Sequence, residues 1–243
     1  MVRLALIPPS SAAGAYNGGV QPSIDVYLEV GAKRAFAAAT DWPGWCRAGR
    51  DEDAALMTLA EYRPRYADAL GARARGLPDL ENAAGLRVSE RLTGNATTDF
   101  GAPGVARASD GLPIADDELS RLTGLLEGAW AAFDRTADEA RDVDLRKGPR
   151  GGGRDRESIV QHVLEADSAY LSALGGRFRS AGAFGPVEAR QLREAFLVAL
   201  AARAHGEPLP AGLRQKSVWA ARFAIRRSAW HALDHAWEIE DRR

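Results

Sequence analysis

The sequence has little of what marks a secreted, membrane-spanning or nucleic-acid-binding protein. Its 243 residues include one cysteine, Cys46, so no internal disulfide can form. It has 32 basic and 33 acidic residues, and a formal net charge of −1 gives no general attraction to nucleic acid or anionic membranes. The apolar stretch at residues 1–7 stops at Pro8, far short of the roughly 20 residues of a membrane helix. With no signal peptide to read, these absences predict a cytoplasmic protein without membrane or nucleic-acid partners.

What is present is the composition of a globular protein. Apolar residues make up 46% of the chain, enough to bury a core, and the length suits one large domain or two ordinary ones. Residues 8–23 are instead rich in proline, serine, alanine and glycine. We expect residues 1–23 to be a flexible leader, or to lie upstream of the true start.

Residues 24–100 combine strand and helix signals and predict a small α/β domain. Apolar or alternating stretches predict strands at 24–30, 35–39 and 86–93. An apolar stripe predicts a helix over about 51–74, capped by Asp51 and kinked or divided at Pro64. We therefore expect residues 24–94 to form an antiparallel sheet with one packed helix.

Residues 113–243 carry helical periodicity throughout and predict an all-α domain. Four apolar stripes predict helices at about 116–142, 156–175, 186–205 and 214–241. Asp155 can cap the second helix, and Pro186 suits the first turn of the third. Four helices of this length favour a four-helix bundle. The predicted fold class is thus α+β, a small antiparallel-sheet-plus-helix domain followed by an all-α bundle.

Three of the four histidines have a spacing typical of a metal site. His231 and His235 are four residues apart on the last predicted helix, which points both imidazoles to one side. His162 lies on the second predicted helix, on a face of apolar and small residues. Three converging imidazoles would leave positions open on a cation, where water or a thiol can be activated. His205, at a helix end, should lie outside this cluster.

The polar residues around these histidines allow two interpretations. His231 and His235 share a stripe with Arg227, Asp234 and Glu238, which is either the lining of a pocket or the solvated side of an amphipathic helix. In the first case Asp234, Glu238 or Glu165 could accept a hydrogen bond from a ligand imidazole and orient it. In the second case these carboxylates are surface residues. The presence of His162 on an inward face favours the pocket.

A histidine early in the second bundle helix, followed by His-x-x-x-His in the fourth, resembles the DinB superfamily. This superfamily includes mycothiol-dependent maleylpyruvate isomerases and bacillithiol transferases, and the resemblance covers about residues 113–243 through His162, His231 and His235. It implies a bundle with up-down-down-up connections and a divalent metal held by the three histidines. Zinc or nickel is the first choice of metal, with iron or manganese as alternatives. A low-molecular-weight thiol is the cosubstrate that the characterised members imply.

A basic, glycine-rich loop precedes the helix that carries His162. It contains Arg150, Arg154 and Arg156 beside Gly151 to Gly153, and it ends at a helix N-terminus, a combination that suits an anion such as a carboxylate or phosphate. It is no phosphate-binding Walker loop, because Gly-Lys-Ser/Thr is missing. The alternative is a solvated loop with incidental arginines.

The first segment is similar to the HicB-type antitoxin domain. The resemblance covers about residues 24–94 and rests on two strands, the turn Trp42-Pro43-Gly44-Trp45, and a helix that opens with acidic residues and alanine at Asp51 to Ala55. The acidic and alanine positions are shifted relative to that family. A helical bundle also stands where HicB proteins carry a DNA-binding tail. We therefore interpret the segment as an interaction or dimerisation module, with a homodimer as one expected assembly.

Together these features predict a divalent-metal-dependent transferase or hydrolase that acts on a small-molecule substrate, with a low-molecular-weight thiol as candidate cosubstrate. The alternative is a non-enzymatic regulator or metal-binding scaffold whose N-terminal domain binds a protein partner. Cys46, beside Trp45 and Arg47, is either a reactive thiol or a small, partly buried residue next to a turn.

Overall fold

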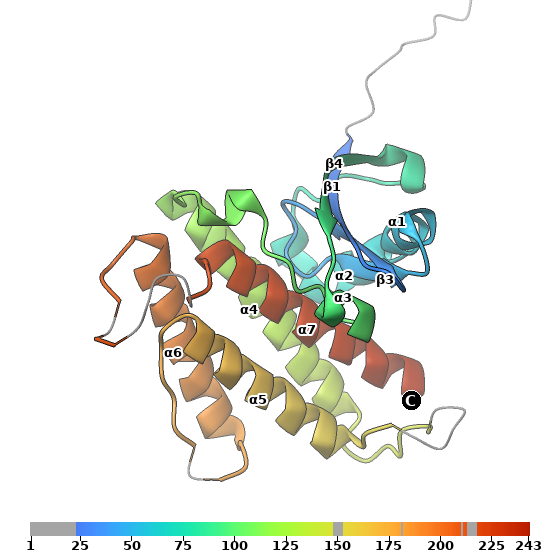
Figure 1. Cartoon of the computed structure of the whole chain (residues 1–243). Helices are drawn as coiled ribbons and strands as arrows, with labels where there is room; N and C mark the ends of the chain where they lie inside the picture. Colours follow the sequence, from blue (N-terminus) through green and yellow to red (C-terminus); the bar gives the residue numbers. More distant parts are fainter. Residues whose placement is uncertain (1–22, 148–152, 181, 210, 213–217) are drawn as a thin grey trace, which may run out of the picture.

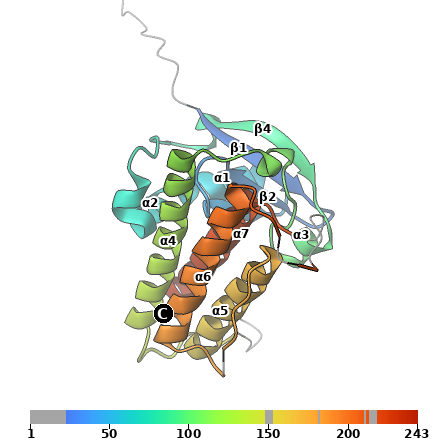
Figure 2. The same ribbon diagram turned by 90° about the vertical axis from the view of Figure 1, so that its left-hand side faces the viewer.

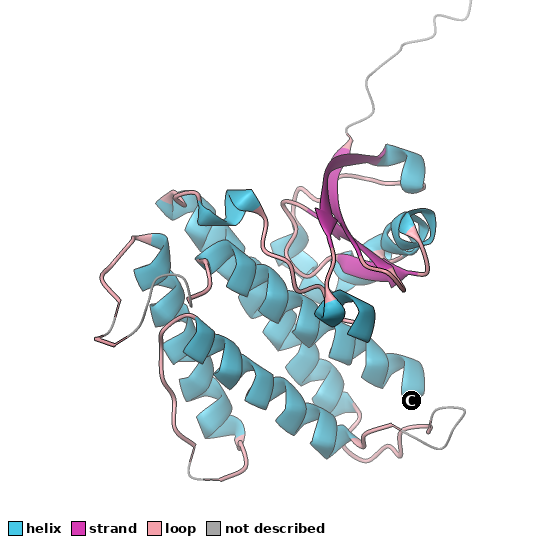
Figure 3. Ribbon diagram, viewed as in Figure 1, coloured by secondary structure: helices cyan, strands magenta, loops and turns pink. Residues whose placement is uncertain are grey.

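The computed structural model describes residues 23–147, 153–180, 182–209, 211–212 and 218–243. Within these residues the chain is an α+β protein with a four-stranded sheet and seven α-helices (Figures 1 and 3). The strands are β1 (Ile24–Val30), β2 (Ala35–Ala39), β3 (Cys46–Gly49) and β4 (Leu86–Thr93). The helices are α1 (Glu52–Glu61), α2 (Arg63–Leu70), α3 (Ala96–Phe100), α4 (Asp116–Glu139), α5 (Arg156–Ala173), α6 (Pro186–Ala204) and α7 (Ala221–Arg242). Except for Ser23, the predicted leader lies outside the described residues.

The sheet is mixed, which corrects the expectation of an antiparallel sheet. Its strand order is β3-β2-β1-β4, with β1 antiparallel to β2 and β2 antiparallel to β3. The β1–β4 pair is parallel. After β3 the chain passes through α1 and α2 and returns at the opposite edge, beside β1. A long helical crossover of this kind delivers parallel strands, whereas the antiparallel pairs here have short connections.

The helix predicted over 51–74 is divided, as Pro64 suggests. Asp51 caps α1, because its carboxylate accepts a hydrogen bond from the Ala54 backbone N–H at 2.8 Å. Pro64 lies in the first turn of α2, where its missing N–H costs nothing. The stretch then ends in a 3-10 turn, Gly71–Ala74. The local signals therefore placed both boundaries correctly.

Both faces of the two central strands, β1 and β2, are largely buried, whereas the edge strand β4 has alternate residues exposed. Val26 and Leu28 of β1 belong to the main core with residues of α1, α2 and α4–α7. On the other face, Tyr27 and Phe36 contact Trp230 of α7, whose ring lies 6.0 Å from that of Phe36 in an edge-to-face arrangement. The main core therefore runs without a break from the sheet into the long helices, and α7 supports the sheet from its second face.

The four long helices lie beside one another in Figures 1 and 2. Helix α7 packs against α4, α5 and α6, and α5 packs against α6. Asp155 caps α5 by accepting a hydrogen bond from the Ser158 backbone N–H at 2.7 Å, and Pro186 opens α6. The start of α7 differs from the predicted residue 214: residues 218–220 are not helical, and 213–217 lie outside the described residues. In the described part of the chain, no helix has both the length and the apolar character that crossing a membrane requires.

The turn at Pro43-Gly44 attaches the sheet segment to α7. Gly44 has φ +93°, a left-handed conformation that favours glycine. A Cβ atom added there would lie 2.7 Å from Leu233 Cδ1 and 3.2 Å from the Ala229 carbonyl oxygen, both on α7. The Trp45 indole N–H donates to the Leu59 carbonyl at 2.8 Å, which ties the same turn to α1. A glycine is needed here because the turn approaches the helix too closely for a side chain.

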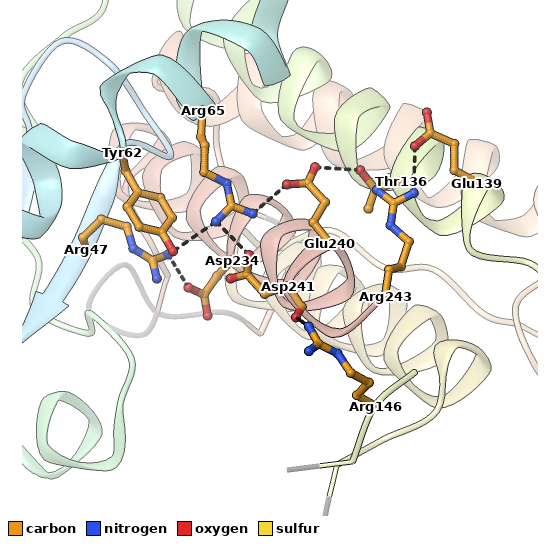
Figure 4. A network of polar contacts seen from close by, with 10 residues as sticks. All are labelled: Arg47, Tyr62, Arg65, Thr136, Glu139, Arg146, Asp234, Glu240, Asp241 and Arg243. Carbon is orange, nitrogen blue, oxygen red and sulfur yellow. Dashed lines mark hydrogen bonds and ion pairs between the residues drawn. The ribbon is translucent and has the colours of Figure 1, made fainter. Parts of the chain in front are cut away.

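Polar contacts extend this attachment along α7 (Figure 4). Arg47 of β3 donates to Asp234 at 2.7 Å, and its guanidinium lies 4.1 Å from the centre of the Tyr62 ring. Arg65 of α2 binds Glu240 at 2.7 Å and Asp241 at 3.0 Å. The first segment thus holds α7 at two points along its C-terminal half.

Candidate metal centre

The three predicted histidines lie together between α5 and α7. The His162 ring centre is 5.1 Å from that of His231 and 5.0 Å from that of His235, and the last two are 4.6 Å apart. One ring nitrogen of each histidine lies within 4.8 Å of the others. Nitrogens that bind one cation at about 2.1 Å are about 3.0–3.4 Å apart, a distance that small ring rotations can reach. The cluster could therefore hold a metal ion.

The helices bring these side chains together in the way that the sequence spacing requires. His231 and His235 occupy successive turns of α7, and His162 faces them from α5. A buried polar contact joins the two helices nearby: the Ser228 hydroxyl donates to the Asp167 carboxylate at 2.6 Å. Since Ser228 precedes His231 by three residues and Asp167 follows His162 by five, this bond helps to fix the spacing of the two helices that carry the histidines.

Burial favours the uncharged form of two of the imidazoles, which is the form that binds a cation. The pKa of His231 is well below its ordinary value, first because of burial and then because of the nearby His235. The pKa of His162 is lowered for the same reasons in the same order. His231 Nδ1 is also buried with no hydrogen-bond partner in the described residues. A buried, uncharged nitrogen without a partner fits a metal ligand, or a group whose partner arrives with the metal.

Glu238 is the carboxylate that contacts one of the three histidines. Its Oε2 lies 2.7 Å from His235 Nδ1, and its Oε1 accepts a hydrogen bond from Arg242 at 2.6 Å. The hydrogen bond with His235 is the largest cause that lowers the pKa of Glu238. Because an ionised carboxylate can only accept a hydrogen bond, this contact favours a proton on His235 Nδ1 and would leave Nε2 available to a cation.

The other two predicted carboxylates lie elsewhere. Asp234 binds Arg47 of β3 and, in the described residues, no imidazole. Glu165 is exposed on α5 and acts on the pKa of His162 through its charge alone. Asp234 is thus a link between the sheet segment and the helix that carries two of the ligands.

A matched pair of substitutions separates these roles. Glu238→Gln should weaken metal binding by about 10-fold to 100-fold, because the amide is a poorer acceptor for the His235 N–H. Asp234→Asn should change metal affinity much less and lower the thermal midpoint, because it weakens the pair with Arg47. Metal affinity would be measured by competition with a chromophoric chelator. Equal metal affinities for the two variants would contradict the role given to Glu238.

The predicted anion-binding arginines are not all at the site. Arg150 lies outside the described residues. Arg156 is engaged by the Ala137 carbonyl at 2.7 Å and by Glu157 at 2.8 Å. Arg154 is exposed, and its positive charge contributes to the low pKa values of His162 and His231. Its carbonyl accepts a hydrogen bond from Arg242, so it lies at the C-terminal end of α7. Arg154 therefore stays an anion candidate, and Arg156 has its partners within the protein.

His205 and Cys46 lie outside the cluster. His205 pairs with Asp116 at 3.1 Å, at the far end of α6, as its position in the sequence predicts. Cys46 is buried between the sheet and α7, and burial raises the pKa of its thiol well above the ordinary value. A thiol in such surroundings stays protonated and unreactive.

The sequence analysis assigned no role to two residues that border the histidines. The Tyr170 ring lies 5.9 Å from that of His231, and Arg227 lies against both Tyr170 and Trp230. Tyr170 follows His162 by two helical turns, a spacing that could have placed it near the site. Arg227 precedes His231 by one turn. The sequence shows that Arg227 belongs to the polar stripe, but it does not show that Tyr170 and Trp230 surround it.

Comparisons with protein-family models, with curated proteins and with solved structures give no match for this chain. The likeness to the DinB and HicB families therefore rests on the residues named above.

Proposed function

We propose that the chain is a divalent-metal-dependent enzyme of the DinB type, a transferase or hydrolase that acts on a small electrophilic molecule. In this proposal α4–α7 form the four-helix bundle, and residues 24–94 are a HicB-like interaction or dimerisation module. The observation that carries the proposal is the convergence of His162, His231 and His235, with Glu238 bound to His235. Zinc or nickel suits three imidazoles best, with iron or manganese next.

The chain's own residues would prepare the site in three ways. Burial keeps His162 and His231 uncharged, and Glu238 fixes the proton of His235 on Nδ1. A divalent cation held by three imidazoles lowers the pKa of water or of a thiol toward neutrality. Tyr170 and Trp230 border His231 and exclude water from one side of it. A low-molecular-weight thiol is the candidate cosubstrate, because a thiolate attacks electrophilic carbon readily.

The proposal is tested with purified protein loaded with zinc or nickel. The disappearance of a cysteine-derived thiol in the presence of chlorodinitrobenzene would be followed against the metal-free protein. We expect turnover that depends on the metal and is absent from His231→Ala. Full metal binding without any turnover, over a panel of electrophiles and ester or amide substrates, would favour the metal-binding regulator. Absence of metal binding would contradict both.

A further inference from the structure

Arg227 is the arginine of α7 that has no carboxylate partner in the described residues. On the same helix Arg222 binds Glu118, Arg226 binds Asp110, and Arg242 binds Glu238. Arg227 Nη1 is instead buried and has no hydrogen-bond partner among the described residues. A guanidinium group stays charged at any physiological pH, and a charge removed from water without a partner is costly. The unpartnered Nη1 of Arg227 therefore favours binding of an anion that comes from outside the chain.

The aromatic side chains around Arg227 fix the orientation of its guanidinium group. Its guanidinium carbon lies 4.7 Å from the centre of the Trp230 ring and 5.6 Å from that of Tyr170. Two aromatic faces orient a planar guanidinium and leave its edge free to donate hydrogen bonds. The Tyr170 hydroxyl interacts with Arg227 through a side-chain hydrogen bond and is a further polar group beside the guanidinium.

Arg227 also lies close enough to the three histidines for one small molecule to contact both. Arg227 lies one turn before His231 on α7, a rise of about 6 Å along the axis. Tyr170 contacts both, since its ring is 5.9 Å from that of His231. A small molecule with its reacting end at the histidines would thus reach Arg227 with a group a few bonds away.

We propose that Arg227 binds a carboxylate of the substrate or thiol cosubstrate while the reacting end of that molecule lies at the three histidines. This inference rests on the proposed function and names the class of ligand. A carboxylate carries one charge, which one guanidinium neutralises, and its two oxygens match the guanidinium fork. A phosphate dianion would need a further cation, and in the described residues Arg227 is the one arginine or lysine that lies over the Tyr170 and Trp230 rings.

A buried water is the alternative partner for Arg227 Nη1. A crevice of about 20 Å³ borders Arg227, Arg226 and Glu29 on the sheet side of α7. That volume holds about one water molecule and no organic ligand. A water there would satisfy Nη1 but give no preference for an anion. A carboxylate site should therefore bind an acid more tightly than its neutral amide, whereas a water site should not.

The test compares a thiol acid with its neutral amide. Cobalt-loaded protein would be titrated with 3-mercaptopropionate and with 3-mercaptopropionamide, and the near-ultraviolet band of thiolate bound to cobalt would report occupancy. Wild type should bind the acid about 10-fold to 100-fold more tightly than the amide, the range for a charged hydrogen bond. In Arg227→Met this preference should fall to about 1, with unchanged metal content. Arg227→Lys should restore part of it.

Two matched variants show where the preference arises. Arg190→Met removes the same charge from an exposed position on α6 and should leave the preference intact. Arg154→Met removes the charge at the opposite end of the site. Loss of the preference in Arg154→Met, with retention in Arg227→Met, would overturn the proposal and assign the anion to the loop. Equal binding of acid and amide by wild type would favour the buried water and also overturn it.

A second measurement separates this inference from the proposed function. Metal-free protein would be titrated calorimetrically with butyrate and with butyramide. If cobalt fails to bind, the metal-dependent function is wrong. Weaker butyrate binding in Arg227→Met than in wild type would then still support the carboxylate site, and its absence would contradict it.

Discussion

Replacing His231 by alanine should remove tight metal binding and all metal-dependent turnover. His231 is the most buried of the three ligands, with 6% of its surface exposed, and its ring lies within 5.1 Å of both others. Without it His162 and His235 can offer two nitrogens, which is fewer than the three protein ligands of an open catalytic site. The loss of affinity should exceed the about 10-fold to 100-fold expected for Glu238→Gln. Elemental analysis and chelator competition would measure it.

The matched control for this result is His205→Ala. His205 is exposed, pairs with Asp116 and lies outside the cluster, so its removal should leave metal content and turnover unchanged. Circular dichroism would show whether His231→Ala keeps its helices. Full metal occupancy in His231→Ala would exclude the three-histidine centre and put the scaffold interpretation first.

The histidine cluster could be read from the sequence because local geometry determines most of it. Four residues is one helical turn, so His231 and His235 had to share a face once α7 formed. His162 was placed by the inward face of its own helix. The caps at Asp51 and Asp155 and the break at Pro64 are likewise local features. Such signals act within a few residues and do not depend on the rest of the fold.

The errors concern contacts between distant parts of the chain. Asp234 pairs with Arg47, which is 187 residues earlier, and helical spacing gives no sign of that partner. The parallel pairing of β4 follows from the path of the chain through α1 and α2, while the strand's own pattern is the same for either direction. The sequence also does not show that the other arginines of α7 pair with carboxylates while Arg227 has no such partner in the described residues. Whether a charge has a partner is decided by packing.

Replacing Asp167 by asparagine should raise the free energy of unfolding at pH 8 by up to about 3 kcal/mol. Asp167 is 1% exposed, and burial raises its pKa to about 6 from an ordinary 3.8. One carboxylate oxygen accepts from Ser228, and the other is buried without a partner in the described residues. Asparagine keeps the Ser228 bond and removes the charge, so the link between α5 and α7 should persist.

The sign of the pH dependence makes this result specific. A carboxyl whose pKa is raised on folding contributes stability below the unfolded value, and this contribution is lost as the pH rises through about 6. The asparagine variant should therefore gain relative to wild type between pH 4 and pH 8, and the difference should level off below pH 4. The free energy of unfolding of both proteins would be measured with denaturant over this range. The contribution of the histidines cancels in the difference, because both proteins contain them. Asp68→Asn, at an exposed position on α2, is the control and should show no such gain. A constant difference between Asp167→Asn and wild type at every pH would contradict this prediction, because it would mean that the attraction to Arg193 balances the effect of burial and leaves the pKa of Asp167 unchanged on folding.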